Sequence, residues 1–291
     1  MKNYSPYSPA IKRINKKKPM SEPARHARRA YQRHSFSFSK AVLAVALVFL
    51  FMPLFVIGIY SFNPGKGSEI TGFSLVWYEK LFFESDELWQ ALANSAIIAL
   101  SAAAVSTVLG TLAAIGTNWY KFKGKGYIQT ISFLPMILPE VIVGVSMLIF
   151  FSGIKMQLGM MTIFIAHTTF CLPFVYLMVL ARLDEFDFSI IEASHDLGAN
   201  ERQTMMKVII PAILPGIFSG FLMAVTMSLE DFVITFFVSG PGSTTLPLYV
   251  YSMVRFGVSP VINALSLLLI LFTMLTAFLL RNFLKGIAAS S

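Results

Sequence analysis

The stretch that decides the fold is SIIEASHDLGANERQTMMKVIIP, residues 189–211, which lies between two long apolar runs. Ser189 begins a capping-box pattern, because Glu192 stands where its side chain can reach back to the first backbone N–H of a helix. Gly198 is placed to end that helix, since glycine adopts a left-handed C-terminal conformation at no steric cost. The first half of the stretch therefore predicts one short helix.

The second half predicts another short helix. Asn200 and Gln203 form a second capping-box pair, and Pro211 limits the helix because proline has no backbone N–H to donate. The whole connection, residues 182–211, contains thirty residues with six acids and three bases, too many for a tight turn between helices. We predict a helix-turn-helix elbow between two apolar segments.

The composition around this elbow is that of a membrane protein. The chain has 291 residues, of which 56% are hydrophobic and 13% charged, whereas soluble chains are about a quarter charged. A transmembrane helix needs about 20 mostly apolar residues. Six windows are long enough, at residues 41–65, 88–120, 126–154, 156–181, 208–254 and 256–280.

The fifth window is too long for one crossing. The Gly- and Pro-containing segment 239–244 ends a helix near residues 213–238, and the segment after it, to about residue 260, is predicted to be re-entrant or on the surface. The first window could also be a cleaved signal peptide, but no small-residue cleavage site stands after it, so we expect a retained helix. The sequence thus predicts an all-α integral membrane protein with six transmembrane helices.

The distribution of positive charge predicts the topology. Residues 1–40 contain eleven Lys and Arg and one acid, a net charge of +10, which leaves the other 251 residues at −2 in a chain of +8. With the N-terminus inside, 19 basic residues fall on the cytoplasmic side and four outside, which predicts an N-in, C-in topology. We expect residues 1–40 to be a basic, disordered cytoplasmic tail near anionic lipid and residues 41–285 to form the transmembrane domain. Nucleic-acid binding by the tail has little support.

The elbow resembles the "EAA…G…I-LP" loop of permease subunits of ABC importers, with a serine in place of the second alanine. The spacing of Glu, Gly and Pro is kept, and the loop precedes the penultimate span, as it does in that family. The resemblance implies a type I ABC importer permease fold in which segment 182–211 docks on an ATPase subunit. The implied coupling residues are Glu192, Ala193, Ser194, Gly198 and Pro211.

A wider resemblance, over about residues 41–285, is to polyamine (spermidine/putrescine) importer permeases. It is carried by residues 138–140, 228–234, 239–248 and 257–265. It implies a permease subunit in a bacterial inner membrane that forms half of the path for a small cation, foremost putrescine or spermidine. The implied partners are a second permease subunit, a dimer of ATPase subunits that bind ATP and Mg²⁺, and an extracytoplasmic binding protein. No cofactor is expected in this chain.

Three carboxylates fall inside predicted spans, where a charge costs at least about 2.5 kcal/mol on insertion scales and so suggests a function. At ~1.5 Å rise per residue, Glu140 lies about 20 Å above Tyr127, and Glu230 with Asp231 about 25 Å above Ile213. Neither helix contains Lys or Arg to neutralise these acids. We expect the three to line the path of a cationic solute. Stabilisation of the interface with a second permease is the alternative.

Other candidate sites are weaker. The aromatic side chains Phe232, Phe236, Tyr249 and Tyr251 could add cation–π contacts with an ammonium group. His167 and Cys171 are four residues apart, but two ligands without a third are usually packing residues, so no metal site is expected.

Other protein classes fit the sequence less well. There is no G-x-x-x-x-G-K-[ST] phosphate loop, so the chain is not expected to hydrolyse ATP or to be an enzyme. An ABC permease for a different solute, such as an iron(III) or sulfate complex, stays open. A stand-alone secondary transporter or channel is less favoured, because the two halves show no internal similarity. An intramembrane enzyme lacks a convincing catalytic pair.

Overall fold

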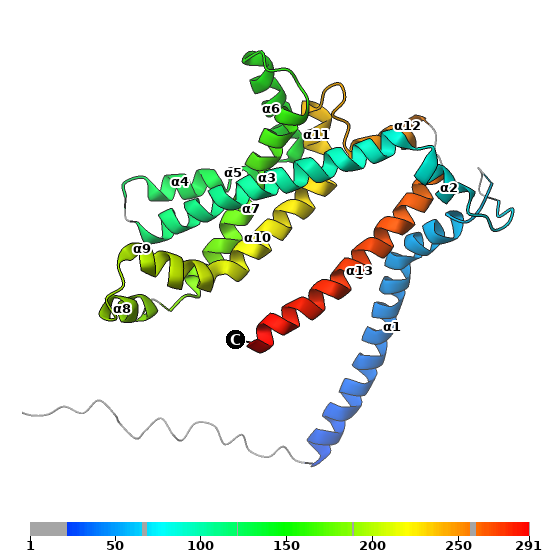
Figure 1. Cartoon of the computed structure of the whole chain (residues 1–291). Helices are drawn as coiled ribbons and strands as arrows, with labels where there is room; N and C mark the ends of the chain where they lie inside the picture. The colour runs from blue at the N-terminus through cyan, green and yellow to red at the C-terminus, as the bar shows by residue number, and fades with distance from the viewer. Residues whose placement is uncertain (1–21, 66–68, 121, 188, 257–259, 291) are drawn as a thin grey trace, which may run out of the picture. The chain divides into compact units, whose positions relative to one another are not determined.

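The computed structural model describes residues 22–65, 69–120, 122–187, 189–256 and 260–290 (Figure 1). Within these residues all regular structure is helical, which confirms the all-α prediction. The helices, in chain order, are α1 (Glu22–Tyr60), α2 (Val76–Phe83), α3 (Asp86–Trp119), α4 (Lys125–Ser132), α5 (Leu134–Ile137), α6 (Glu140–Gly153), α7 (Met160–Asp184), α8 (Ser189–Asp196), α9 (Glu201–Thr204), the π-helix η2 (Met205–Ile209), α10 (Ile210–Glu230), α11 (Val233–Val238), α12 (Leu246–Phe256) and α13 (Val261–Ser290).

Candidate membrane spans match the six predicted windows. Five helical segments are long and apolar enough to cross a bilayer, and the number is six when one bent pair of helices is counted as a single broken span. The five are Phe38–Tyr60, Asp86–Trp119, Met160–Asp184, Glu201–Glu230 and Val261–Leu279, and the pair is Lys125–Ile137 with Glu140–Gly153.

The chain forms two compact units. One contains Ser61–Ser266, and the other contains Met1–Tyr60 with Leu267–Ser291. In the second unit α1 begins at Glu22, so the later part of the predicted disordered tail is helical. Residues 1–21 lie outside the described residues. Beyond Phe38 the apolar side chains of α1 are largely exposed, as expected for a surface that meets lipid.

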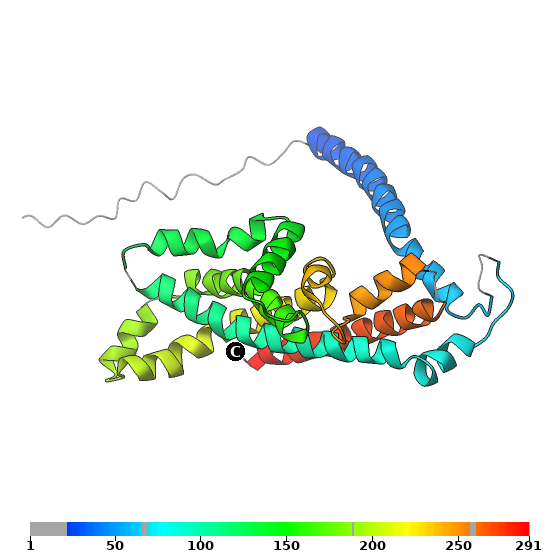
Figure 2. The same ribbon diagram turned by 90° about the horizontal axis from the view of Figure 1, so that it is seen from above.

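The core of the larger unit is a layer of three long helices, α3, α7 and α10, which lie against one another (Figures 1 and 2). Val175 of α7 is fully buried between two glycines. A Cβ on Gly110 of α3 would lie 2.9 Å from its Cγ1 atom, and one on Gly220 of α10 would lie 3.2 Å from it. Small residues thus allow the three backbones to approach closely, as is common in membrane helix packing.

Two of the predicted spans are broken rather than straight. Span three bends by 107° between Ile137 and Glu140, where Leu138 is extended and Pro139 lacks an N–H. The predicted helix 213–238 ends at Glu230, and Asp231 has extended geometry before α11 begins. The straight-helix depth expected for Glu140 above Tyr127 is therefore wrong, whereas α10 runs from Ile213 to Glu230 as one helix. Helices α6 and α11, which come directly after the two breaks, pack against each other.

The segment after residue 244 forms α12, a short helix that packs on the N-terminal part of α3. The side-chain amide of Asn94 donates to the carbonyl of Thr244 at 3.0 Å, and the hydroxyl of Ser95 accepts the N–H of Leu246 at 2.8 Å. The segment predicted to be re-entrant or on the surface is thus a helix attached to α3. Helices α8 and α9 lie at the other end of the same unit (Figure 1).

Candidate functional site

The α8–α9 elbow begins at a cap that differs from the predicted one. The backbone N–H of Ser189 donates to the carboxylate of Asp187 at 2.9 Å, so Asp187 takes the place that the sequence assigned to Glu192. Hydrogen bonds from the backbone and side chain of Ser189 hold the pKa of the Asp187 carboxyl below its usual range. The sequence therefore predicted the wrong partner for the Ser189 N–H, because Asp187, two residues upstream, is an acceptor as well.

The corner of the elbow is made by Gly198, as predicted. Its φ is +83°, a left-handed conformation that side chains disfavour. The N–H of Gly198 donates to the carbonyl of His195 at 2.8 Å, and the N–H of Ala199 donates to that of Ser194 at 3.0 Å. These two bonds form a Schellman motif, which satisfies the carbonyls at the end of α8.

The two halves of the elbow are joined by hydroxyl groups. Ser194 is only 8% exposed, and its Oγ lies 2.9 Å from Oγ1 of Thr204. Ser194 therefore makes a contact that an alanine at this position could not make. Asn200 and Gln203 cap α9 reciprocally, with bonds of 2.9 and 3.0 Å, which confirms the second capping box.

Pro211 does not limit the second helix of the elbow. The π-helical turn η2 precedes it, and the N–H of Ile210 donates to the carbonyl of Met205, five residues back. The helix therefore continues from Glu201 to Glu230 through the proline. The prediction that Pro211 ends a helix was wrong because the wider turn tolerates a residue without an N–H.

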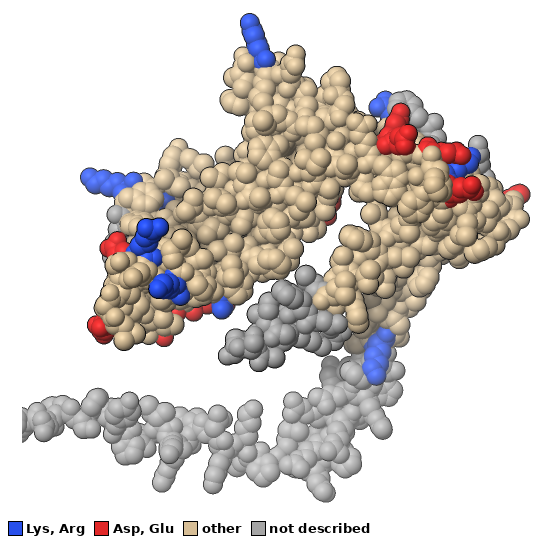
Figure 3. All heavy atoms as spheres, in the orientation of Figure 1, with Lys and Arg blue, Asp and Glu red and all other residues tan. Residues whose placement is uncertain are grey.

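The exposed face of α8 is partly apolar. Leu197 is 90% exposed, Ile190 is 47% exposed, and Ala193 is exposed between them. These residues stand at helical spacing of three and four, so they share one side of the helix. Glu192 is also exposed, beside Ala193. Around α8 and α9, and around α2, Lys, Arg, Asp and Glu gather on the face drawn in Figure 3.

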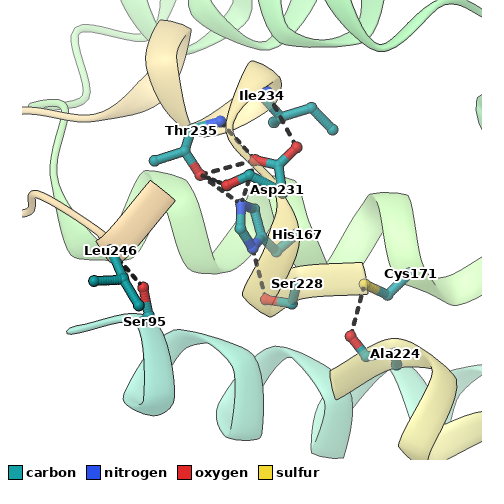
Figure 4. Close-up of polar contacts among 9 residues, drawn as sticks. All are labelled: Ser95, His167, Cys171, Ala224, Ser228, Asp231, Ile234, Thr235 and Leu246. Carbon is teal, nitrogen blue, oxygen red and sulfur yellow. Dashed lines mark hydrogen bonds and ion pairs between the residues drawn. The ribbon is translucent and has the colours of Figure 1, made fainter. Parts of the chain in front are cut away.

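A buried polar network lies at the break in span five (Figure 4). Asp231 is 7% exposed, and its carboxylate accepts the backbone N–H of Ile234 at 3.2 Å and that of Thr235 at 2.9 Å. The hydroxyl of Thr235 donates to it at 2.8 Å. Asp231 therefore satisfies the free N–H groups at the start of α11, as an N-terminal capping residue does.

His167 of α7 joins this network from the facing helix. Its Nε2 atom lies 3.1 Å from the Asp231 carboxylate and 2.9 Å from the Thr235 hydroxyl, and its Nδ1 atom lies 2.7 Å from the Ser228 hydroxyl. His167 is 1% exposed. The sequence alone indicated a packing residue here. The missed signal was the spacing of Ser228, Asp231 and Thr235, which puts three polar groups on one helical side.

The three membrane carboxylates come together, but in different roles. Glu140 stands in the first turn of α6, close enough to Asp231 and Glu230 for electrostatic interaction, and both Glu140 and Glu230 are exposed. Asp231 has both carboxylate oxygens engaged by the protein itself. The two glutamates are thus exposed, whereas Asp231 holds the start of α11 in place.

Three of the four predicted aromatic residues, Phe232, Phe236 and Tyr251, form a cluster beside the break. The ring of Phe232 lies 4.6 Å from that of Tyr251 and 5.7 Å from that of Phe236, between centroids. Cys171 lies apart from them, with its thiol directed to the carbonyl of Ala224. Among the described residues no group of three His, Cys, Asp or Glu could hold a metal ion.

A family model described as "Binding-protein-dependent transport system inner membrane component" matches residues 106–289. The chain belongs to this family. It is therefore a multi-pass component of an inner membrane and a transport protein. The match covers the α8–α9 elbow and both broken spans.

Similar proteins carry the match further along the chain. The spermidine/putrescine transport system permease protein PotC of Haemophilus influenzae is 38% identical over 240 residues, which are 82% of this chain and 93% of that protein. The putrescine transport system permease protein PotI of Escherichia coli is 40% identical over 237 residues, 79% of this chain and 84% of that protein.

Solved structures show the same fold. A chain of a bacterial ABC transporter involved in the import of the acidic polysaccharide alginate matches with a TM-score of 0.71 at 15% identity, over 87% of this chain and 97% of that one. A chain of the methionine ABC transporter MetNI matches with a TM-score of 0.53 at 22% identity, over 68% and 93%. The fold is that of ABC transporter permeases.

Proposed function

We propose that this permease forms half of the translocation path of an ATP-driven importer for a small organic cation with two or more ammonium groups, putrescine or spermidine. The relatives of 38% and 40% identity are permeases for these solutes. The observation that carries the proposal in this chain is the pair of exposed glutamates, Glu140 and Glu230, where two broken spans meet.

The chemistry of this pair suits an ammonium group. The segments α6, α10 and α11 contain no Lys or Arg, so nothing on them neutralises the glutamates. A carboxylate without a countercharge at membrane depth is costly. A cation that passes the point where the two broken spans meet lowers the free-energy cost of these charges. Its binding stays weak because both glutamate carboxylates are exposed and remain partly hydrated.

The α8–α9 elbow is proposed to couple this path to ATP hydrolysis. Its exposed apolar side chains, Ile190, Ala193 and Leu197, would enter a cleft of an ATPase subunit, with Glu192 beside them. Gly198, Ser194 and Pro211 would act through the shape of the elbow rather than by contact. ATP and Mg²⁺ would bind to the ATPase subunits, and this chain would hold no cofactor.

The proposed assembly contains four kinds of partner. They are two ATPase subunits, a second permease subunit, an extracytoplasmic binding protein and lipid. A structural relative was solved as an alginate ABC transporter in complex with a ligand-bound periplasmic protein, which supports this type of assembly. The eleven Lys and Arg residues in residues 1–40 support an N-in, C-in orientation, which would place the elbow in the cytoplasm.

The experiment is uptake of labelled putrescine and spermidine by cells that express this chain with its partner subunits. Uptake should need ATP and the binding protein, and Glu140→Gln with Glu230→Gln should reduce it while the complex still assembles. The exposed Glu84, far along the chain from both spans, supplies a matched control as Glu84→Gln. Uptake of a different solute, with neither polyamine transported, would contradict the proposal.

A further inference from the structure

A cavity lined by both charged and aromatic side chains lies away from the carboxylate pair, at the end of α3 where α12 packs. Its volume is about 360 Å³, and a smaller cavity of about 110 Å³ adjoins it. Glu87, Thr244 and Tyr249 line both. It lies at the end of the unit opposite α8, which is the outer end in the proposed orientation (Figure 1).

The walls of this cavity come from elements that the structure holds together. Glu87 is in the first turn of α3, and Tyr249 and Tyr251 are on α12. Asn94 donates to the carbonyls of Gly242 and Thr244 at 3.3 and 3.0 Å, which fixes the loop before α12 to α3. The site is therefore preformed by hydrogen bonds between the Asn94 side chain and the loop that precedes α12.

Its chemistry matches an alkylammonium ion. The Glu87 carboxylate is exposed and supplies a negative charge. Burial raises the pKa of the Tyr249 hydroxyl, and the nearby charge of Glu87 adds to the effect, so Tyr249 stays protonated at neutral pH and keeps an oxygen that can accept an N–H. The rings of Phe236 and Tyr251 add faces for cation–π contact, with centroids 6.2 Å apart.

The aromatic residues also connect the cavity with the carboxylate pair. Phe236 lines the cavity and lies one helical turn from Phe232, which is next to Asp231. Both rings contact Tyr251. Arg255 lines the cavity as well. A dication held at Glu87 would therefore extend its other end along the rings toward Glu230.

We propose that this cavity is the first binding site in the permease for the ammonium group of the solute, formed by Glu87, Tyr249, Tyr251 and Phe236. The inference rests on the proposed function, because it assumes a cationic solute released at the outer end. The size is sufficient. A six-heavy-atom diamine takes about 180 Å³ if each heavy atom needs the ~30 Å³ of a liquid water.

The test uses thiol modification, since Cys171 is the only cysteine and is buried. Ser252 lines the cavity, and Ser252→Cys in the assembled importer reports on it, with Thr244→Cys as a second reporter. The rate of cysteine modification is measured with two methanethiosulfonate reagents, one that carries a trimethylammonium group and one that carries a sulfonate group. Each rate is then measured again with putrescine present.

The expected result is preferential modification by the cationic reagent, which putrescine slows. Glu87→Gln should lower the ratio of cationic to anionic rates about tenfold, since one charge at ~6 Å in water changes each rate about threefold in opposite directions. Arg255→Gln should raise the ratio. Glu84→Gln, which changes an exposed acid that lines neither cavity, should leave it within about twofold.

A ratio unchanged by Glu87→Gln at both reporters, or no slowing by putrescine, would overturn the inference. Uptake of putrescine by the unmodified importer is measured separately. If the importer takes up putrescine but putrescine does not slow modification at either cysteine, the cavity is not a binding site and the proposed function is unaffected. Absence of uptake with every partner present would refute the proposed function itself.

Discussion

Replacement of Asp231 and replacement of Glu230 should affect different properties, although the two residues are adjacent. Asp231 accepts two backbone N–H groups, a threonine hydroxyl and a histidine nitrogen in a buried site. Glu230 is exposed at the end of α10. We expect Asp231→Asn to reduce stability and Glu230→Gln to reduce transport.

The magnitude is set by the groups that each change leaves without a partner. In Asp231→Asn the new side-chain amide keeps one oxygen toward Thr235 and His167 and turns its NH₂ group toward the N–H of Ile234. One buried N–H then lacks an acceptor, which costs about 1–3 kcal/mol. Asp231→Ala removes every acceptor oxygen of this side chain and one of the two partners of His167 Nε2, and about 3–5 kcal/mol is expected. Glu230→Gln removes no contact of this kind.

The assay separates stability from transport. Detergent-solubilised importer is heated, and the fraction that still elutes as assembled complex gives the midpoint of unfolding. Uptake is measured at a lower temperature and divided by the amount of assembled complex. The expected order of midpoints is wild type equal to Glu230→Gln, then Asp231→Asn, then Asp231→Ala, with normalised uptake lowest for Glu230→Gln.

One result would refute this reasoning. If Asp231→Asn unfolds at the wild-type midpoint yet loses as much normalised uptake as Glu230→Gln, then Asp231 contacts the solute and is not a positioning residue. A double-mutant cycle of His167→Ala with Asp231→Ala gives an independent check. Residues in one hydrogen-bond network should show a coupling of about 0.5–3 kcal/mol, and additive effects would contradict the network.

Three further predictions concern other parts of the chain. Gly198→Asp should abolish uptake while leaving membrane insertion intact, and Gly198→Asn, which tolerates a positive φ, should retain more activity in the same assay. Titration by NMR should give the carboxyl group of Asp187 a pKa below the ordinary aspartate value of about 3.9. Because the pKa in the folded state is depressed, Asp187 stabilises α8 at pH values above the ordinary pKa, and this stabilisation is lost as the pH falls through the folded pKa. An ordinary or raised pKa would contradict the Ser189 contact. Gly240→Ala should lower the unfolding midpoint, since a Cβ there collides with the carbonyl of Leu158, and an unchanged midpoint would refute that close contact.

The sequence predicted features that depend on local chemistry. Six apolar windows predicted the spans because span length is set by bilayer thickness, and Gly198 predicted the corner because few residues other than glycine adopt its φ. Asn200 and Gln203 predicted the second cap because both partners lie within one turn. Each of these signals is contained in a few neighbouring residues.

Features that depend on distant residues were not predicted. The break after Glu230 is stabilised by His167, which is 64 residues from Asp231 in the sequence, so helical periodicity alone continued the helix to residue 238. The bend near Pro139 changed the expected depth of Glu140, because a proline kink has no angle that can be read from sequence. The sequence did not distinguish Asp231 from Glu230. Tertiary contacts bury Asp231 and hydrogen-bond its carboxylate, whereas Glu230 is exposed.

Helix ends indicate which glutamate should hold the solute more strongly. Glu140 is the first residue of α6, where the positive end of the helix dipole stabilises its charge, whereas Glu230 is the last residue of α10, where the negative end destabilises its charge. Each effect is worth about 0.3–1 kcal/mol at exposed sites and more when partly buried.

The negative charge of Glu230 is therefore the less stable of the two, and a bound cation stabilises it more than it stabilises the charge of Glu140. We expect Glu230→Gln to reduce normalised putrescine uptake several-fold more than Glu140→Gln, when both are measured at saturating binding protein. Equal losses would mean that helix ends do not distinguish the two groups. A larger loss in Glu140→Gln would reverse the order and would place the main ammonium contact on α6, next to the bend in span three.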